Sequence, residues 1–144
     1  MKFEDIFAEW DKDSKIDKNE LGDESLNIPR LHHKYYTIFI SERSTLRRLD
    51  HEMKQLKLDK YEFYAHGHTD ETREKGWKLP PRGMILKSDV PMFVDADKDI
   101  INLSLKIGTQ QEKVEFLDSI IRSLNNRNFL IKNYIDYMKF INGE

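Results

Sequence analysis

The stretch from Arg30 to Ala65 contains neither glycine nor proline, and this feature constrains the fold more than any other. Pro29 stands before it, and proline is well tolerated in the first turn of a helix because its missing N–H has no partner there. Gly67 stands just after it, where glycine commonly ends a helix. The stretch therefore predicts one long helix over residues 29–65, within an all-α chain.

A second long helix is indicated in the C-terminal part by a regular apolar pattern. Its seam residues follow one another at three- and four-residue spacing, with one polar member: Ile100, Leu103, Ile107, Gln110, Val114, Leu117, Ile121 and Leu124. This spacing is typical of a coiled-coil seam. Residues 101–107 also alternate with a period of two, which leaves a local strand as the competing interpretation. The heptad pattern is the longer of the two and favours the helix.

The ends of this second helix are predicted from capping and turn residues. Asp95 is expected to be its N-cap, with Asp97 in the first turn, where the helix dipole favours a negative charge. Asn125-Asn126 is expected to mark a turn or kink. A last helix is then predicted over residues 128–141.

Two short helices are predicted near the N-terminus. Four apolar residues recur at helical spacing and indicate an amphipathic helix over residues 3–11: Phe3, Ile6, Phe7 and Trp10. Asp17 is expected to cap the next helix, with Glu20 as its capping-box partner.

The middle of the chain, residues 66–94, contains three glycines and three prolines and is predicted to be a loop, with a short extended piece at Met84–Lys87. We therefore expect a single helical domain over residues 1–144. Its expected parts are an acidic N-terminal segment (1–29), a long basic helix (29–65), the loop region (66–94) and C-terminal helices for core and oligomerisation (95–144).

Composition narrows the class of protein. The net charge is −2, which argues against a uniformly basic nucleic-acid binder but not against a local basic patch. Cysteine is absent, so disulfides, thiolate metal sites and a cysteine nucleophile are excluded. No apolar window is long enough for a membrane span, and the N-terminus does not resemble a signal peptide, so a cytoplasmic protein is expected. Hydrophobic residues make up only 38% of the chain, which indicates either partial disorder or a core completed by self-association.

The long basic helix has an apolar seam with a lysine in it. The apolar seam residues are Leu46, Leu49, Met53, Leu56 and Phe63, and Lys60 occupies the place between the last two. A buried and unpaired charge is costly. Either the seam opens at that end, or Lys60 meets an anion.

Beside that seam, four cations and one aromatic ring share an arc of the helix: Arg43, Arg47, Lys54, Lys57 and Tyr61. Closely spaced cations match the phosphates of a single-stranded nucleic acid, and a ring can stack on a base. The alternative interpretation is the ordinary solvated face of a charged helix. The adjacent pair His32-His33 points in two directions on a helix and is interpreted as ordinary surface.

The loop around Trp77 is a second candidate for nucleic-acid binding. Four cations surround this tryptophan in sequence: Arg73, Lys75, Lys78 and Arg82. An exposed tryptophan flanked by cations can serve as a base-stacking platform. In the alternative interpretation, Trp77 anchors a long loop onto the core.

No metal site or catalytic set is predicted. His66, His68 and Asp70 have a ligand-like spacing, but no second cluster completes a hydrolase site, so ordinary turn residues are the favoured interpretation. The run from Asp95 to Asp99 mimics the start of an EF-hand loop but lacks its glycine and its final glutamate, so helix capping is favoured there. Phosphate-binding loops and nucleophile motifs are absent from the sequence, and no cofactor is expected.

The C-terminal segment is apolar on more than one helix face. Its candidate oligomerisation residues are Phe129, Leu130, Ile131, Tyr134, Ile135, Met138 and Ile141. A terminal helix with two apolar faces can contact its own protomer with one face and a neighbour with the other. The alternative is complete burial within the monomer, and the low overall apolar content favours self-association.

The chain resembles a known family, the UvsY-type recombination mediators of T4-like phages. The matching segments keep their order and spacing over most of the sequence: Met1–Ile6, Lys57–Ala65, Ala96–Ile100 and Asn126–Lys132. Each motif is short, so the order of the set carries the resemblance.

This resemblance implies a protein that is not an enzyme. It implies a small helical ring-like oligomer, a hexamer or heptamer, that binds single-stranded DNA in the cytoplasm of an infected bacterial host. It further implies that the protein helps a RecA-like phage recombinase displace the phage single-stranded-DNA-binding protein during recombination, repair and replication.

The resemblance also assigns residues. The family ties DNA binding to two basic positions within the segment that matches 57–64. Lys60 stands at one of them, whereas Leu58 stands at the other with Lys57 beside it. The C-terminal helix drives oligomerisation in the family, and residues 128–141 match it. Two alternatives remain: an oligomeric helical protein–protein adaptor without DNA affinity, and a metal hydrolase built on His66, His68 and Asp70.

Overall fold

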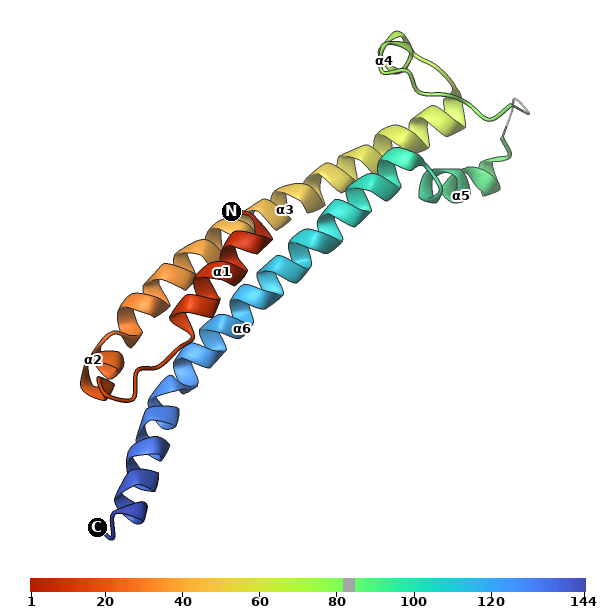
Figure 1. The fold of residues 1–144 in the computed structure, drawn as a ribbon. Coiled ribbons are helices and arrows are strands. Elements are labelled where there is room, and N and C mark those ends of the chain that lie inside the picture. The colour runs from red at the N-terminus through yellow and green to blue at the C-terminus, as the bar shows by residue number, and fades with distance from the viewer. Residues whose placement is uncertain (82–84) are drawn as a thin grey trace. The chain divides into compact units, whose positions relative to one another are not determined.

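The computed structural model describes residues 1–81 and 85–144, and every regular element in these ranges is helical, as expected for an all-α chain (Figure 1). The elements in chain order are α1 (Phe3–Asp13), α2 (Leu21–Leu26), α3 (Ile28–His66), α4 (Asp70–Glu74), the 3-10 turn η1 (Lys87–Asp89), α5 (Val90–Asp95) and α6 (Lys98–Ile141). The backbone contacts divide the chain into two compact units. Unit 1 is Met1–Ser44 with Gln111–Glu144, and unit 2 is Thr45–Gln110.

The core of unit 1 is formed where α1, the first part of α3 and the second part of α6 pack together. Its buried residues are Ile6, Leu31, Tyr35, Leu117, Ile120, Ile121 and Leu124. Trp10 packs edge-on against Tyr35, with ring centroids 5.4 Å apart. Three of the seven buried residues belong to the seam predicted from sequence, so the seam points inward here.

Polar contacts hold the less regular parts of unit 1 onto α6 and α3. Arg127, only 3% exposed, donates to the carbonyl oxygens of Asp13 and Lys15 and to the carboxylate of Glu24. The Tyr35 hydroxyl donates to Asp13 over 2.8 Å. Burial opposes the charge of the Asp13 carboxylate, but hydrogen bonds from Lys34 and Tyr35 outweigh this and lower its pKa.

The core of unit 2 is smaller and lies where α5 meets the second part of α3 and the start of α6. Val90, Val94 and Ile100 are buried, and partly buried side chains pack around them: Met53, Leu56, Tyr61, Tyr64, Ala65 and Ile85. Leu49 and Phe63 of α3 are also buried in this unit.

The two long helices follow the sequence signals closely. Pro29 lies in the first turn of α3, and the helix ends at His66 because Gly67 takes a positive φ of 88° and donates to the Phe63 carbonyl. Along α6 every predicted seam residue is buried or half-buried, whereas Ile101 and Leu105 are exposed. The strand interpretation of this segment is wrong, and the helical one is confirmed.

The predicted start of α6 is wrong by two residues. Asp95 is the last residue of α5, and the carboxylate that caps α6 belongs to Asp97, which accepts from the backbone N–H groups of Asp99 and Ile100. The short helix α5 forms here and buries Val90 and Val94. Because α5 extends to Asp95, this residue cannot be the N-cap of α6. The run from Asp95 to Asp99, which resembles the start of an EF-hand loop, does cap a helix as predicted, and Asp97 is the capping residue.

Two other local predictions fail at least in part. A turn at Asn125-Asn126 is wrong, because α6 is continuous there, with Leu124 and Arg127 buried and both asparagines exposed. The alternative, a kink, agrees with Figure 1, in which α6 bends in its blue C-terminal part. Asp17 does not cap α2; its carboxylate accepts from the Asn19 N–H in a local turn, and α2 starts after Glu20 with no side-chain cap.

The predicted loop region contains structure of its own. Thr69 and Thr72 form a capping box that starts α4, and η1 and α5 follow further along. These elements are too short for apolar periodicity to reveal them. The extended piece predicted at Met84–Lys87 lies partly outside the described residues, and Lys87 belongs to η1.

Candidate nucleic-acid interface

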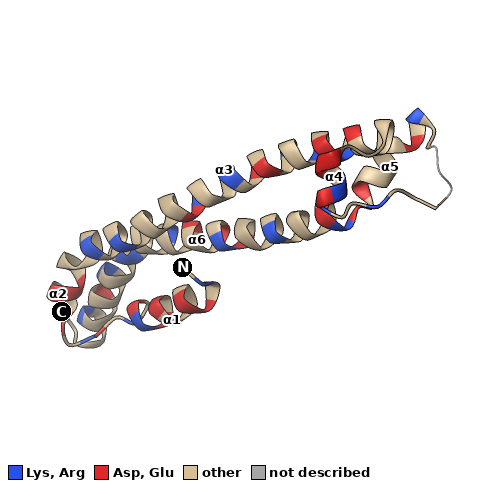
Figure 2. Cartoon of the chain, turned by 90° about the horizontal axis from the view of Figure 1, so that it is seen from above, with Lys and Arg blue, Asp and Glu red and all other residues tan. Residues whose placement is uncertain are grey.

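Three of the predicted cations in unit 2 lie exposed on α3. Arg47, Lys54 and Lys57 are all solvent-accessible. No carboxylate in the described part of the chain lies within ion-pair distance of them, whereas the neighbouring Arg48 is paired with Glu52 over 3.0 Å. Figure 2 shows such basic positions in blue at intervals along the helix. Unpaired cations keep their full charge for an incoming phosphate.

Arg43 and Tyr61, the other members of the predicted arc, are partly buried. Arg43 belongs to unit 1, where its guanidinium lies over the Phe39 ring at 5.1 Å from the centroid. Tyr61 belongs to unit 2 and packs against the α5 core cluster. Both side chains therefore make packing contacts within their own unit, and each is less exposed than the three cations above.

Lys60 does not lie on this surface. It is 2% exposed, and its ammonium contacts Asp97 at 3.1 Å and Asp99 at 2.8 Å. The anion that the sequence required for a lysine in the seam is thus present on the start of α6. Because the ammonium is nearly fully buried and already paired with two carboxylates, we leave Lys60 out of the candidate surface.

Asp97 is the centre of this buried cluster. It accepts from the Tyr64 hydroxyl over 2.7 Å as well as from Lys60 and the α6 backbone. Burial opposes the Asp97 charge, but the hydrogen bonds from Tyr64 and Lys60 outweigh it and lower the pKa of Asp97. Burial and the same hydrogen bond raise the pKa of Tyr64. Sequence reasoning missed the partners of Lys60, although its place in the seam signalled that one existed.

Trp77 packs onto α3, as its anchoring interpretation predicts. Its ring meets Phe63 edge-on at 5.4 Å between centroids, and the Lys60 ammonium lies 3.7 Å from its centroid. A cation over the ring is a favourable contact that also covers part of the face a base would use. Lys78 is exposed beside it, and the two residues line a hollow of about 490 Å³ with Lys75 and Lys98. Arg82 lies outside the described residues.

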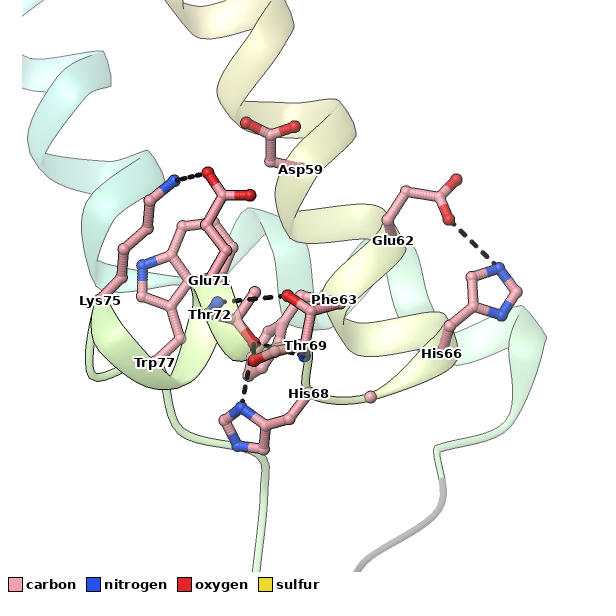
Figure 3. A pocket seen from close by; sticks show the side chains of 11 residues that line it. Asp59, Glu62, Phe63, His66, His68, Thr69, Glu71, Thr72, Lys75 and Trp77 are labelled. Atoms are coloured by element: carbon pink, nitrogen blue, oxygen red, sulfur yellow. Dashed lines mark hydrogen bonds and ion pairs between the residues drawn. The ribbon is translucent and has the colours of Figure 1, made fainter.

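His66, the last residue of α3, and His68, which follows it, do not converge on a common point. The hollow that they help to line, of about 280 Å³, is drawn in Figure 3, where the two imidazoles point apart. His66 pairs with Glu62, and His68 contacts the Thr72 hydroxyl. Within residues 1–81 and 85–144, no group of three or more potential ligands is placed to hold a metal ion.

The C-terminal part of α6 leaves most of its apolar side chains exposed. Ile131 is buried in unit 1, and Tyr134 lines a small groove with residues of the 16–21 segment. The remaining predicted oligomerisation residues are exposed by 37 to 63%: Phe129, Leu130, Ile135, Met138 and Ile141. Complete burial within the monomer is therefore wrong. Among the described helices, none has the length and apolar character of a bilayer span.

Exposed cations, aromatic rings and an apolar helix face are features of a binding protein. Residues 9–144 match the family model described as recombination, repair and ssDNA binding protein UvsY. The match covers nearly the whole chain, so this protein belongs to the UvsY family.

Solved structures show the same fold. Two crystal structures of the bacteriophage T4 recombination mediator protein UvsY are similar to this chain. The lattice type II structure shares 21% identity, with a TM-score of 0.81 and coverage of 97% of each chain. The lattice type I structure shares 22% identity, with a TM-score of 0.79 and coverage of 94% of this chain and 98% of that one. No curated protein matches the chain significantly.

Proposed function

We propose that this protein is a recombination mediator that binds single-stranded DNA and promotes loading of a RecA-like recombinase onto DNA covered by the phage single-stranded-DNA-binding protein. It acts in the cytoplasm of the infected host and is not an enzyme. Membership of a family of recombination, repair and ssDNA-binding proteins supports this proposal. The observation that carries it is the set of exposed, unpaired cations on α3: Arg47, Lys54 and Lys57.

Those cations suit the DNA backbone rather than base sequence. Lysine and arginine side chains on one helix neutralise phosphates and release counterions, whatever the bases are. One such set of three is a weak site. Several copies in an oligomer bind the same strand, and multivalency turns weak contacts into tight binding. A modest patch therefore suffices although the net charge of the chain is −2.

The proposal is tested by fluorescence anisotropy with labelled oligo-dT. We expect Lys54→Ala with Lys57→Ala to weaken binding and to flatten the dependence of affinity on salt by about 0.7 for each phosphate that is no longer neutralised. The matched control is Arg48→Ala with Arg122→Ala, which removes two exposed cations that are already paired within their helices. Equally weakened binding in the two double variants would show that only total charge matters. Retention of wild-type affinity by the first would refute the α3 surface.

We further propose that the exposed apolar face of α6 assembles the protein into a ring-like homo-oligomer, a hexamer or heptamer. Ile135 is 38% exposed in the protomer, so Ile135→Asp leaves the protomer folded but buries an unpaired carboxylate in the interface, at a cost of several kcal/mol. Light scattering is expected to show monomers or small species. Asn133→Asp adds the same charge at an exposed polar position of α6 and is the control. A full-sized oligomer from Ile135→Asp would contradict the assembly proposal.

The exposed apolar face also supports a second candidate function, a protein–protein adaptor without DNA affinity. An adaptor would assemble normally yet show no salt-dependent binding to oligo-dT. The anisotropy titration of the wild-type protein therefore separates the two functions.

A further inference from the structure

One side of α3 in unit 1 carries a row of rings that no predicted function uses. His32, Tyr36, Phe39 and Arg43 follow one another at four-, three- and four-residue spacing, which puts them on one helix face. The His32 and Tyr36 rings are nearly parallel, at 12° and 5.6 Å between centroids. Tyr36 lies 6.0 Å from Phe39, whose ring carries the Arg43 guanidinium.

The outer members of this row are accessible. Tyr36 is 41% exposed, and the neighbouring Ile40 is 44% exposed. Phe39 packs inward against the unit 1 core and fixes the base of the row. An exposed tyrosine held by a flanking stack and a packed ring is a preformed surface, which gives up little side-chain entropy when a partner binds.

The charge around the row selects the partner. Between Ile28 and Ser44 the only acidic residue is Glu42, which is 6% exposed and paired with the N-terminal amine and Lys113. Lys34 of this stretch is neutralised by Glu9 and Asp13 of α1, whereas Arg43, at the end of the row, has no carboxylate within ion-pair distance in the described part of the chain. A second copy of the same face would oppose one Arg43 to another, whereas a single-stranded nucleic acid offers a phosphate to Arg43 and flat bases to the rings.

We propose that Tyr36 and His32 form a base-stacking subsite for single-stranded DNA, with Arg43 contacting the adjacent phosphate. This inference rests on the proposed function, since it concerns how the same ligand is held. The subsite would bind bases, whereas the exposed cations of α3 contact the phosphates of the DNA backbone. Stacking is sequence-tolerant, because every base has a π-face.

The subsite is tested with two probes of equal length, oligo-dT and an abasic phosphodiester oligomer that has the phosphates without the bases. We expect Tyr36→Ala to weaken binding of oligo-dT about tenfold and to leave binding of the abasic oligomer unchanged. Tyr36→Phe keeps the ring and retains wild-type affinity. Tyr36→Leu keeps apolar bulk without a ring and behaves like Tyr36→Ala.

A second measurement locates the contact. Photo-cross-linking with 5-iododeoxyuridine in the oligonucleotide, followed by tryptic digestion, is expected to give an adduct on Tyr36 in the peptide of residues 35–43. Adducts found only on other peptides would overturn the subsite.

The remaining outcomes are distinguishable. If Tyr36→Ala and the wild type prefer oligo-dT over the abasic oligomer equally, no base stacks on Tyr36 and the inference fails while DNA binding stands. A change of oligomer size in Tyr36→Ala by light scattering would make this face a subunit contact and would also overturn the inference. Absence of wild-type binding to both probes would refute the proposed function itself.

Discussion

Among the residues that the structure describes, each unit contains one deeply buried cation, Arg127 in unit 1 and Lys60 in unit 2, and the two are held by different means. The Arg127 guanidinium binds two backbone carbonyls, at 2.8 and 3.0 Å, and the Glu24 carboxylate at 2.9 Å. The Lys60 ammonium contacts two carboxylates and the Trp77 ring. The planar guanidinium ties the end of α1, the following segment at Lys15 and α2 to α6, whereas the compact ammonium neutralises acids at a helix start.

The difference shows in what remains when each cation is removed. Without Arg127, the carbonyls of Asp13 and Lys15 and the Glu24 carboxylate no longer have their shared donor. Without Lys60, Asp97 still accepts from Tyr64 and from the α6 backbone, and the Asp99 side chain is 54% exposed and can be hydrated. Burial alone therefore does not decide which cation contributes more to stability. The contribution depends on whether the partner groups keep other hydrogen-bond donors or water when the cation is removed.

The largest effect is expected at Arg127. Arg127→Met should lower the free energy of unfolding by about 3–5 kcal/mol, because it leaves three partly buried acceptors, one of them charged, without their shared donor. Urea unfolding followed by circular dichroism measures this change. Arg127→Lys should recover only part of it, since an ammonium cannot span the three acceptors. Full recovery of stability by lysine would show that the charge at this position matters and the planar shape of the guanidinium does not. It would contradict the proposed difference between Arg127 and Lys60.

A smaller effect is expected at Lys60. Lys60→Met should cost about 1–3 kcal/mol, because the Asp97 carboxylate keeps its other donors. The same variant removes the cation from the Trp77 ring, so tryptophan fluorescence should change in the folded state. The control is Lys98→Met, which removes an exposed lysine from the same hollow and should change stability little. A destabilisation at Lys60 as large as that at Arg127 would contradict the comparison.

The sequence predicted the long elements well because periodicity and helix-end residues act locally. The limits of α3 followed from Pro29 and Gly67, and the seam of α6 followed from its spacing. Local signals failed where packing between distant segments decides. Asn125-Asn126 stays helical because the residues on either side of this pair are buried in the core of unit 1. Asp97 rather than Asp95 caps α6 because Asp95 is the last residue of α5.

The candidate site was predictable in part for the same reason. The cations Arg47, Lys54 and Lys57 could be placed on one side of a helix from their spacing alone. Lys60 could be recognised as needing an anion, but its partners are 37 and 39 residues away in sequence, and no local pattern names them. The row of His32, Tyr36 and Phe39 was overlooked, although its four- and three-residue spacing continues the register of Arg43.

We propose that the exposed cations of α3, and not the buried Lys60, hold the DNA. The most direct test compares the dependence of oligo-dT affinity on salt for three proteins: the wild type, Lys60→Met, and Lys54→Ala with Lys57→Ala. We predict that Lys60→Met keeps the wild-type slope, provided that circular dichroism shows it folded, and that the double variant has a flatter slope. A flattened slope in folded Lys60→Met, together with a wild-type slope in the double variant, would contradict the account.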